Sequence, residues 1–402
     1  MPNKFITLLR NIDNNIYERL GNIRILFCVC NNYGWHCLKP IIEEIASDAA
    51  SRQIDVYACI TTGDVDAEII ALPQGVVLSG AGIAVWRKWH YIIHTDIIDP
   101  HFYRSAVHIM LPHGVGFGNM RLNYNCRQYQ SYKSDLYLGL SYAEYESFND
   151  DPLVKHENKY FAIVGSAKTD RLFSNRTELR DIALRNRKID PLKKTVLISS
   201  HFTETSIYKS LGISFVRTIL EEFSPECNFI IIGHAKNWTD QGGAERWREI
   251  EQLEVTYANT IVDRYVDFYP YLCVADTFIT DHSSFTIECV IADKPILYFN
   301  PPSREFNSIA VKNIYMDATE CFTGGDEIGR LLRNALSGID GKKDNRKRMR
   351  EYFFANEGTA ARHAADVILS LGRVCTIHSR HWNDRNRYFI RQDMAVNRMA
   401  SE

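Results

Sequence analysis

The chain alternates short apolar runs with helical patterns, and it does so in two successive series. The first series of apolar runs occupies residues 23–29, 54–60, 75–78, 90–94, 107–111, 136–140 and 160–164. The second series occupies residues 195–199, 228–232, 259–262, 278–279 and 296–299. Apolar segments of strand length that alternate with helical segments are typical of βα units around a parallel sheet. The pattern therefore predicts an α/β protein with two consecutive Rossmann-type sheets.

A polar, charge-dense stretch separates the two series. Residues 174–194 interrupt the apolar rhythm and are the expected linker. A chain of 402 residues is long enough for two domains that each bury their own core. We expect an N-terminal domain at residues 1–180 and a C-terminal domain at residues 181–402, with a C-terminal tail that could pack back on the first. Since ligands of such sheets bind beyond the carboxyl ends of the strands, the expected site is a cleft in which the two domains face each other.

Charge and cysteine usage narrow the classes of partner. The formal net charge is −2, which argues against a general attraction to nucleic acid. The ten cysteines form no CxxC pair, and several lie in apolar patterns, namely Cys28, Cys30, Cys59, Cys273 and Cys289. Free, buried thiols in a reducing compartment explain this better than a disulfide framework or a zinc site.

Hydropathy predicts a cytoplasmic protein. No apolar run approaches the ~18–20 residues that cross a bilayer, and the N-terminus lacks the apolar core of a signal peptide. Two basic stretches stand out, at residues 342–350 and among the arginines from residue 373 onward. Solvated helix faces explain them, as does a peripheral contact with the inner face of the cell membrane.

The turn after residues 278–279 is the first candidate site. Thr280, Asp281, Ser283 and Ser284 supply hydroxyls and caps between an apolar strand and the next helix. Free backbone N–H groups and the helix dipole favour an anion at such a point. An ordinary N-cap is the alternative.

Histidines follow two other predicted strands. His113 and Gly114 follow residues 107–111 after Pro112, and an imidazole there can accept a hydroxyl proton near neutral pH. His234 and Lys236 follow residues 228–232, where a cation can stabilise charge that develops on phosphate oxygens. Each histidine alone is equally well explained by a structural role in a turn.

Further polar groups follow the remaining strand ends. His201 and Thr203 lie after residues 195–199, and they fit phosphate or ribose contacts or the capping of a helix. Lys168 could pair with a ligand phosphate, and Asp170 could cap the helix that follows it. Arg362 is a candidate anion contact beside the turn that begins at residue 356.

Two kinds of site are not supported by the sequence, a metal site and a dinucleotide or ATP site. Asp64 and Asp66 have the spacing of a metal-binding pair but no further ligands nearby. The glycines at 114, 116 and 118 have neither the GxGxxG spacing of a dinucleotide fold nor the GK[ST] ending of a P-loop. Hydride transfer and ATP hydrolysis are therefore not expected.

Read in order, these motifs resemble the CDP-glycerol glycerophosphotransferase family of teichoic-acid and capsule polymerases and primases. The likeness covers roughly residues 100–370. It rests on Pro112-His-Gly114, Gly165-Ser-Ala-Lys-Thr-Asp170, the segment 196–205, Gly233-His234, the stretch 276–299 and Glu357-Gly-Thr-Ala360. The strongest part is Thr280-Asp-His-Ser-Ser284 with Asp293-Lys-Pro295.

The resemblance implies a GT-B fold and transfer of a polyol phosphate from a CDP-activated donor, CDP-glycerol above all, with release of CMP. It implies no required metal or other cofactor. The N-terminal domain would serve the acceptor, a cell-surface polysaccharide or a lipid-linked, teichoic-acid-like polymer, and the C-terminal domain the nucleotide donor. His113 would be the catalytic base, His234 the second-domain histidine, and Ser283 and Ser284 the serines that bind donor phosphate. Gly114, Lys168, His201, Thr203, Lys236, Thr280, Asp281 and Arg362 complete the expected donor-binding set.

The chain departs from the family pattern at several positions. Pro112 replaces the usual Trp, His282 the usual Tyr and Ala235 the usual Pro, and no arginine lies near residues 203–206. The donor and the acceptor therefore stay open. A GT-B glycosyltransferase that uses a nucleotide sugar in capsule or lipopolysaccharide synthesis is the nearest alternative, and a non-catalytic binding module is another.

Overall fold

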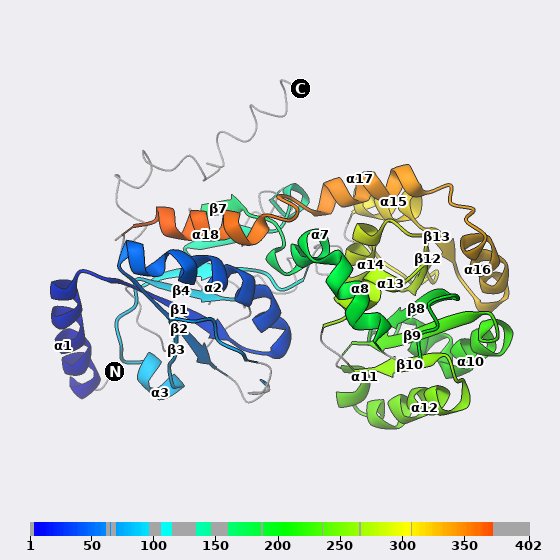
Figure 1. Cartoon of the computed structure of the whole chain (residues 1–402), viewed down its shortest axis with the longest axis horizontal. Helices are drawn as coiled ribbons and strands as arrows, with labels where there is room; N and C mark the ends of the chain where they lie inside the picture. The colour runs from blue at the N-terminus through cyan, green and yellow to red at the C-terminus, as the bar shows by residue number, and fades with distance from the viewer. Residues whose placement is uncertain are drawn as a thin grey trace, which may run out of the picture. The chain divides into compact units, whose positions relative to one another are not determined.

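The computed structural model describes residues 4–61, 65, 70–95, 106–114, 134–145, 160–185, 188–234, 236–264, 267–306 and 308–372. The described chain packs as two compact units (Figure 1). The first unit contains the described residues up to Asp170 together with those from Phe354 onward, and the second contains Arg171–Phe353.

The first unit is built on a seven-stranded parallel sheet in the order β3-β2-β1-β4-β5-β6-β7. Its strands are β1 (Ile23–Val29), β2 (Ile54–Ile60), β3 (Val76–Leu78), β4 (Tyr91–His94), β5 (Val107–Met110), β6 (Leu136–Gly139) and β7 (Tyr160–Ile163). The strand order reverses between β1 and β4, which is where open α/β sheets bind ligands.

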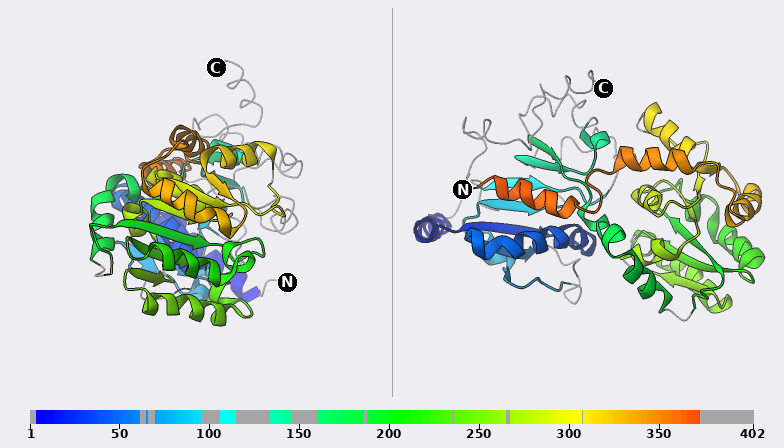
Figure 2. Two further views of the ribbon diagram at one scale, coloured as in Figure 1. Left: turned by 90° about the vertical axis from the view of Figure 1, so that its right-hand side faces the viewer. Right: turned by 45° about the horizontal axis from the view of Figure 1, so that its top comes forward.

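Helices cover the first sheet. They are α1 (Lys4–Leu20), α2 (Asn32–Arg52), α3 (Ala81–Ala84), the short 3₁₀ helix η2 (Ala167–Thr169) and α18 (Ala360–Ser370). α2 begins at Asn31, whose side chain accepts a hydrogen bond from the Gly34 N–H. α18 packs against α2, although some three hundred residues separate them, and lies beside this sheet in Figures 1 and 2.

The second unit holds a six-stranded parallel sheet in the order β10-β9-β8-β11-β12-β13, the strand order of a Rossmann fold. Its strands are β8 (Lys194–Ser200), β9 (Cys227–Gly233), β10 (Thr260–Asp263), β11 (Thr277–Thr280), β12 (Ile296–Phe299) and β13 (Glu320–Phe322). The order reverses between β8 and β11.

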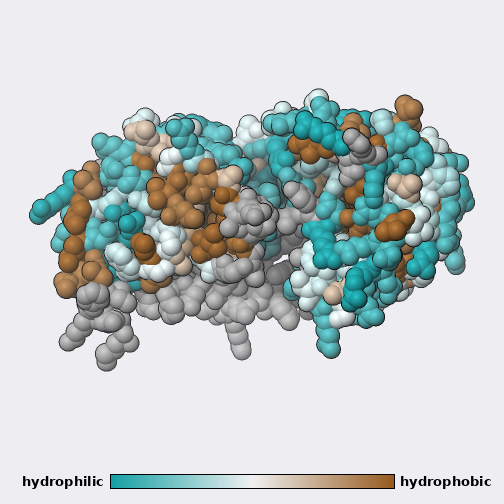
Figure 3. Space-filling view, turned by 60° about the horizontal axis from the view of Figure 1, so that its bottom comes forward, coloured by the Kyte–Doolittle hydropathy of each residue, from teal (hydrophilic) through white to brown (hydrophobic). Residues whose placement is uncertain are grey.

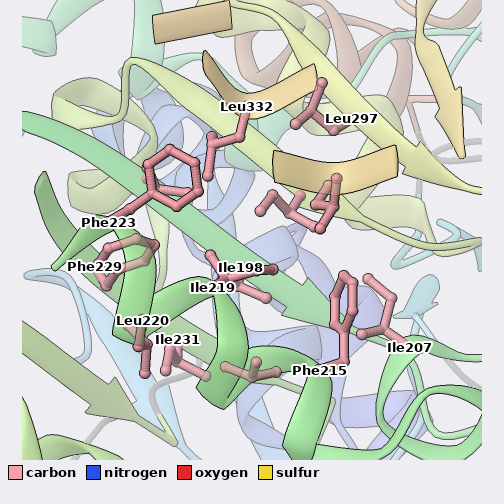
Figure 4. Packing of buried hydrophobic residues seen from close by; sticks show 14 of the residues in the cluster. Ile198, Ile207, Phe215, Ile219, Leu220, Phe223, Phe229, Ile231, Leu297 and Leu332 are labelled. Carbon is pink, nitrogen blue, oxygen red and sulfur yellow. The ribbon is translucent and has the colours of Figure 1, made fainter. Parts of the chain in front are cut away.

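Helices pack on both faces of the second sheet, so its central strands read as continuous apolar runs. The helices are α7 (Arg171–Ser174), α8 (Arg176–Leu184), α9 (Ile207–Ser210), α10 (Gly212–Phe223), α11 (Lys236–Thr239), α12 (Gly243–Thr256), α13 (Tyr269–Val274), α14 (Ser284–Cys289) with η3 (Val290–Ala292), α15 (Ile309–Ala318), η4 (Gly325–Glu327) with α16 (Ile328–Leu336), and α17 (Lys343–Phe353). On one face, alternate residues of the strands join α10, α12 and α16 in a single apolar cluster (Figure 4). This core fixes the ends of the strands, and with them the loops described below.

The strands predicted from the apolar runs are confirmed, and each predicted end lies within one residue of the observed end. The predicted linker is wrong, because α8 lies inside it and packs against α13 of the second unit. The structure changes units between Asp170 and Arg171, ten residues before the predicted limit, and the chain re-enters the first unit at Phe354. Sequence patterns did not indicate α1 or β13. The five cysteines expected to be free and buried are confirmed as such.

Candidate functional site

The second unit gathers four loops at the carboxyl edge of its sheet. The loops after β8, β9, β11 and β12 carry His201, His234, Asp281 and Arg304, respectively. Because β8 and β11 flank the point where the strand order reverses, their loops diverge there and leave room for a ligand.

Asp281 connects the loop after β11 to the loop after β8. Its buried carboxylate accepts hydrogen bonds from Ser200 Oγ at 2.7 Å, from the His201 N–H at 2.9 Å and from the Ile207 N–H at 2.8 Å. Burial raises the pKa of Asp281, and these three bonds oppose the rise. The expected phosphate contact from Asp281 is thereby corrected: its oxygens already hold the loop after β8, and a carboxylate has no proton to donate to phosphate.

Ser200 extends the same network to β9. Its hydroxyl accepts from the Tyr208 N–H at 3.1 Å, and its carbonyl accepts from Asn237 Nδ2 at 2.8 Å and from the His234 N–H at 3.3 Å. Gly233 precedes His234 because a Cβ at that position would lie 2.5 Å from the buried ring of Trp247. The backbone that carries His234 is therefore fixed from both sides.

Two histidines and a lysine surround Phe202 in this unit. The rings of His201 and His234 are 5.1 Å apart, and both contact Phe202, at centroid distances of 4.2 Å and 4.6 Å. Lys236 places its Nζ 4.5 Å from the centre of the Phe202 ring. Three of the predicted site residues are thus brought together.

His201 is held in its neutral form. Burial lowers its pKa to about 3, and the positive charges of His234, Arg304 and Lys236 act in the same direction. Its Nδ1 lies 3.3 Å from the hydroxyl of Thr203, another predicted residue. At neutral pH this imidazole therefore contributes hydrogen bonds to the site, and the cationic charge comes from its neighbours.

The turn after β11 presents hydroxyls as predicted. Ser283 occupies the N-cap position of α14, yet its side chain makes no capping bond to the helix, and Ser284 is the first helical residue. The hydroxyl of Thr280 is buried and has no hydrogen-bond partner within the described part of the chain. His282 points elsewhere, since it is buried against Phe306 and Tyr315 and lies 2.9 Å from the Tyr298 hydroxyl.

Arg304 is the cation that sequence reasoning missed. It is partly buried on the loop after β12, and its Nη1 donates to Thr205 Oγ1 at 3.0 Å. Burial lowers the pKa of Arg304 to about 10, a value at which the guanidinium is still charged at neutral pH. His201 and His234 each follow the last residue of a strand, whereas Arg304 lies five residues beyond the end of β12, so a search directly after the apolar runs did not reach it.

In the first unit, His113 follows β5 and is exposed. Its Nδ1 lies 3.5 Å from the carbonyl of Thr95, the residue that follows the neighbouring strand β4. The ring of Tyr33, at the start of α2, meets the His113 ring edge-on at 5.8 Å. Gly114 is adjacent and partly exposed, so the structure also places this predicted residue beside the histidine.

Lys168 belongs to the same cluster of the first unit. The side chain is 3% exposed, its Nζ donates to the Tyr33 hydroxyl, and it lies 4.1 Å from the centre of the Tyr33 ring. The hydroxyl of Thr95 is buried with no hydrogen-bond partner among the described residues. Tyr33 and Thr95 were not predicted. Both follow strands that flank the reversal of strand order, a position that is visible only once the order is known.

Two predictions for this unit need correction. Arg362 is exposed on α18 and pairs with Glu44, Asp48 and Asp366, and these carboxylates raise its pKa. Its charge is already balanced by neighbours, so an anion contact is not indicated. Asp170 does cap a helix, but it caps α18 through the N–H groups of residues 360 and 361, not the helix that follows it in sequence.

Some candidates lie outside the described residues. These are Asp64, Asp66, Gly116, Gly118, Ala235 and the arginines from residue 373 onward. Within the described ranges, no cluster of three or more His, Cys, Asp or Glu residues could hold a metal ion. Among the helices described, none is long and apolar enough to cross a membrane.

Two Rossmann-type units, with cationic groups at the strand-order reversal of the second, place the protein in the GT-B fold class. Solved structures support this fold: the wall teichoic acid polymerase TagF matches with a TM-score of 0.67, 14% identity and coverage of 92% of this chain and 97% of that one. The glycosyltransferase WaaG of lipopolysaccharide biosynthesis matches at 0.52, with 13% identity and coverage of 86% and 99%. UDP-GlcNAc 2-epimerase from Neisseria meningitidis matches at 0.53, with 13% identity and coverage of 86% and 100%.

A family profile makes the assignment more specific. The profile of CDP-glycerol:poly(glycerophosphate) glycerophosphotransferases matches residues 156–369, more than half of the chain. The chain therefore belongs to this family and is a glycerophosphotransferase. A comparison with curated proteins finds no significant match.

Proposed function

We propose that this enzyme transfers glycerol phosphate from CDP-glycerol, or a closely related CDP-polyol, to a hydroxyl of a teichoic-acid-like or other cell-surface polymer, and releases CMP. The family match, which spans Arg171–Phe353 of the second unit, carries the proposal. The acceptor oxygen attacks the phosphorus that bears the glycerol, and the bond from this phosphorus to the bridging oxygen breaks. The electron pair leaves with CMP, and the acceptor proton passes to a base.

The second unit supplies the donor site in this proposal. His234 and Lys236 face the phosphates as charge moves onto the leaving oxygen, while neutral His201 and Thr203 form hydrogen bonds. The hydroxyls and N–H groups at Ser283 and Ser284 bind a phosphate oxygen. We propose that these groups, with no separate cofactor, position the donor, since positioning and electrostatics dominate phosphoryl transfer.

The first unit supplies the base. The Thr95 carbonyl can only accept a hydrogen bond, so its contact with His113 favours the tautomer that carries its proton on Nδ1. The lone pair then lies on Nε2, where it can accept the proton of the acceptor hydroxyl. Lys168 and His113 both contact Tyr33. We therefore assign Lys168 to the acceptor side, in place of the donor role expected from the sequence.

Product analysis tests the reaction. Incubation with CDP-glycerol and a polymer acceptor should release CMP, whereas a glycosyltransferase would release CDP and a binding module neither. His113→Ala should abolish transfer and leave the affinity for CDP within about twofold. Turnover of His113→Ala near the wild-type rate would contradict the assignment of the base.

We further propose that the enzyme works in the cytoplasm, in peripheral contact with the inner face of the membrane, and α1 supports this. The helix is bound to its own unit through polar groups: Arg10 donates to the Val85 carbonyl at 2.6 Å, and Asp13 pairs with Arg24 at 2.6 Å. Its opposite side carries a ridge of four aliphatic residues that are 48–63% exposed: Leu8, Ile12, Ile16 and Leu20. The ridge forms the apolar band at the left end of Figure 3.

An outward apolar ridge on a helix fits insertion at a lipid interface. The basic stretch at residues 342–350 supports such a contact less well, because Arg346 of α17 is buried and pairs with Asp340 and Asp293. In flotation with vesicles that contain anionic lipid, the double variant Ile12→Gln, Ile16→Gln should be recovered at least threefold less than the wild type. Equal recovery of the variant and the wild type would show that the apolar ridge of α1 does not bind the membrane.

A further inference from the structure

The second unit has a cation that reaches across the reversal of strand order. Arg304 follows β12, and its guanidinium donates to Thr205 in the loop after β8 at 3.0 Å. In the sheet, β11 lies between these two strands. The side chain therefore spans the carboxyl end of β11, where the Ser283 turn begins, and its charge also acts on Asp281.

The loop after β8 has no cation of its own at its start. Residues 201–208 read His-Phe-Thr-Glu-Thr-Ser-Ile-Tyr, without lysine or arginine. The backbone of Arg304 is fixed by a turn, in which its N–H donates to the Pro301 carbonyl at 2.9 Å. The guanidinium is thus brought to this loop from another strand and held there by a defined contact.

Several cationic groups gather around this point. Arg304, Lys236 and His234 all act on His201 in the direction that disfavours a further positive charge. Of the carboxylates nearby, Asp281 has its oxygens occupied by three donors, and Glu204 is exposed and pairs with Lys209. Such an arrangement is suited to an anion that brings more than one negative charge.

We propose that Arg304 is a binding residue for the diphosphate of the nucleotide donor, with the fork of its guanidinium on a phosphate oxygen pair. This assignment rests on the proposed function and deepens it. Arg304 recognises the phosphates and not the base or the ribose. Its contact with Thr205 positions the side chain, so Thr205 matters less than the charge itself.

A series of ligands that differ in their phosphates tests the assignment on the full chain. Calorimetry with cytidine, CMP, CDP and CDP-glycerol should show that Arg304→Gln weakens CDP and CDP-glycerol by about 10- to 100-fold, the range expected for losing charge-assisted hydrogen bonds. Cytidine should bind as it does to the wild type. Arg304→Lys should recover part of the loss, since it keeps the charge but not the fork. Arg248→Gln, which changes an exposed arginine on α12 of the same unit, should bind every ligand normally.

Two further measurements separate the possible failures. Thr205→Val should lose less CDP affinity than Arg304→Gln; an equal or larger loss would make Arg304 a purely structural residue and overturn the proposal. Equal CDP affinity of Arg304→Gln and wild type, with both folded by circular dichroism, would also overturn it. If the wild-type enzyme binds CDP but releases no CMP from CDP-glycerol, the proposed function fails, while the effect of Arg304→Gln on CDP still decides the assignment of Arg304.

Discussion

Replacing Asp281 by asparagine should lower the free energy of unfolding of the second unit by about 2–4 kcal/mol. The carboxylate accepts from Ser200 Oγ, the His201 N–H and the Ile207 N–H, all within 3 Å. An asparagine keeps one acceptor oxygen and turns the other into an NH₂ group that faces a donor. Hydrogen bonds to charged groups contribute about 1.5–3 kcal/mol and neutral ones about 0.5–1.5, so two weakened bonds cost about 1 kcal/mol each. A lost third bond adds about 1–3 kcal/mol, offset in part because a neutral amide is easier to bury.

Urea unfolding followed by tryptophan fluorescence measures the change, with Asp326→Asn as the control because Asp326 is exposed. Hydrogen exchange adds a local readout, since a peptide that covers residues 200–208 should exchange faster in the Asp281 variant. If the variant and the control unfold at the same urea concentration, the carboxylate does not hold the loops together. A large loss of CDP affinity without a change in unfolding would instead return Asp281 to the ligand site.

Three more predictions follow from single contacts. The folded pKa of His201, about 3, lies below its ordinary value of 6.5, so the contribution of His201 to stability is present above pH 6.5 and is lost as the pH falls toward 3. Between pH 7 and pH 5, the free energy of unfolding of the wild type, measured in urea, should fall by up to about 2 kcal/mol more than that of His201→Gln. The same pH dependence in both proteins would contradict this. Gly233→Ala should cost about 1–3 kcal/mol, because its Cβ would lie 2.5 Å from the buried Trp247 ring; an unchanged melting temperature would show that Trp247 can move. Arg362→Ala should leave CDP affinity within about twofold, and a tenfold loss would restore it as an anion contact.

The fold was predictable because parallel strands that are buried on both faces consist of continuous apolar residues, which can be recognised in the sequence. Residues 25–29 of β1 and 196–198 of β8 are fully buried, and both runs are visible in the sequence. The helix α1 escaped prediction for the opposite reason. It turns Leu8 and Ile12 outward and binds its unit through Asp13, so its pattern does not describe a helix packed by its apolar face.

The candidate site was predictable only as far as strand ends could be located. His113, His201 and His234 each lie two residues beyond the end of an apolar run, and the structure places each at a carboxyl end. Which ends are neighbours depends on the strand order, which the sequence does not state. The pairing of Arg304 with Thr205 and that of His113 with Tyr33 both require that order. Arg362 was selected from the sequence, but its three carboxylate partners lie on α2 and on its own helix, and the packing of α18 on α2 was not predicted.

Asp281 places a negative charge at the centre of a site that is proposed to bind phosphate, and this makes the roles of the two cations unequal. Its charge holds the loops, but it would repel a phosphate bound nearby. Arg304 is the cation whose charge acts on that carboxylate, and it is partly buried, whereas Lys236 is exposed and contacts the Phe202 ring. Solvent and salt screen an exposed charge more strongly than a buried one. Arg304→Gln should therefore weaken CDP binding more than Lys236→Gln, and the difference should grow between 50 mM and 500 mM salt. An equal loss in both variants at high salt would contradict the idea that burial makes Arg304 the stronger of the two cations for the ligand.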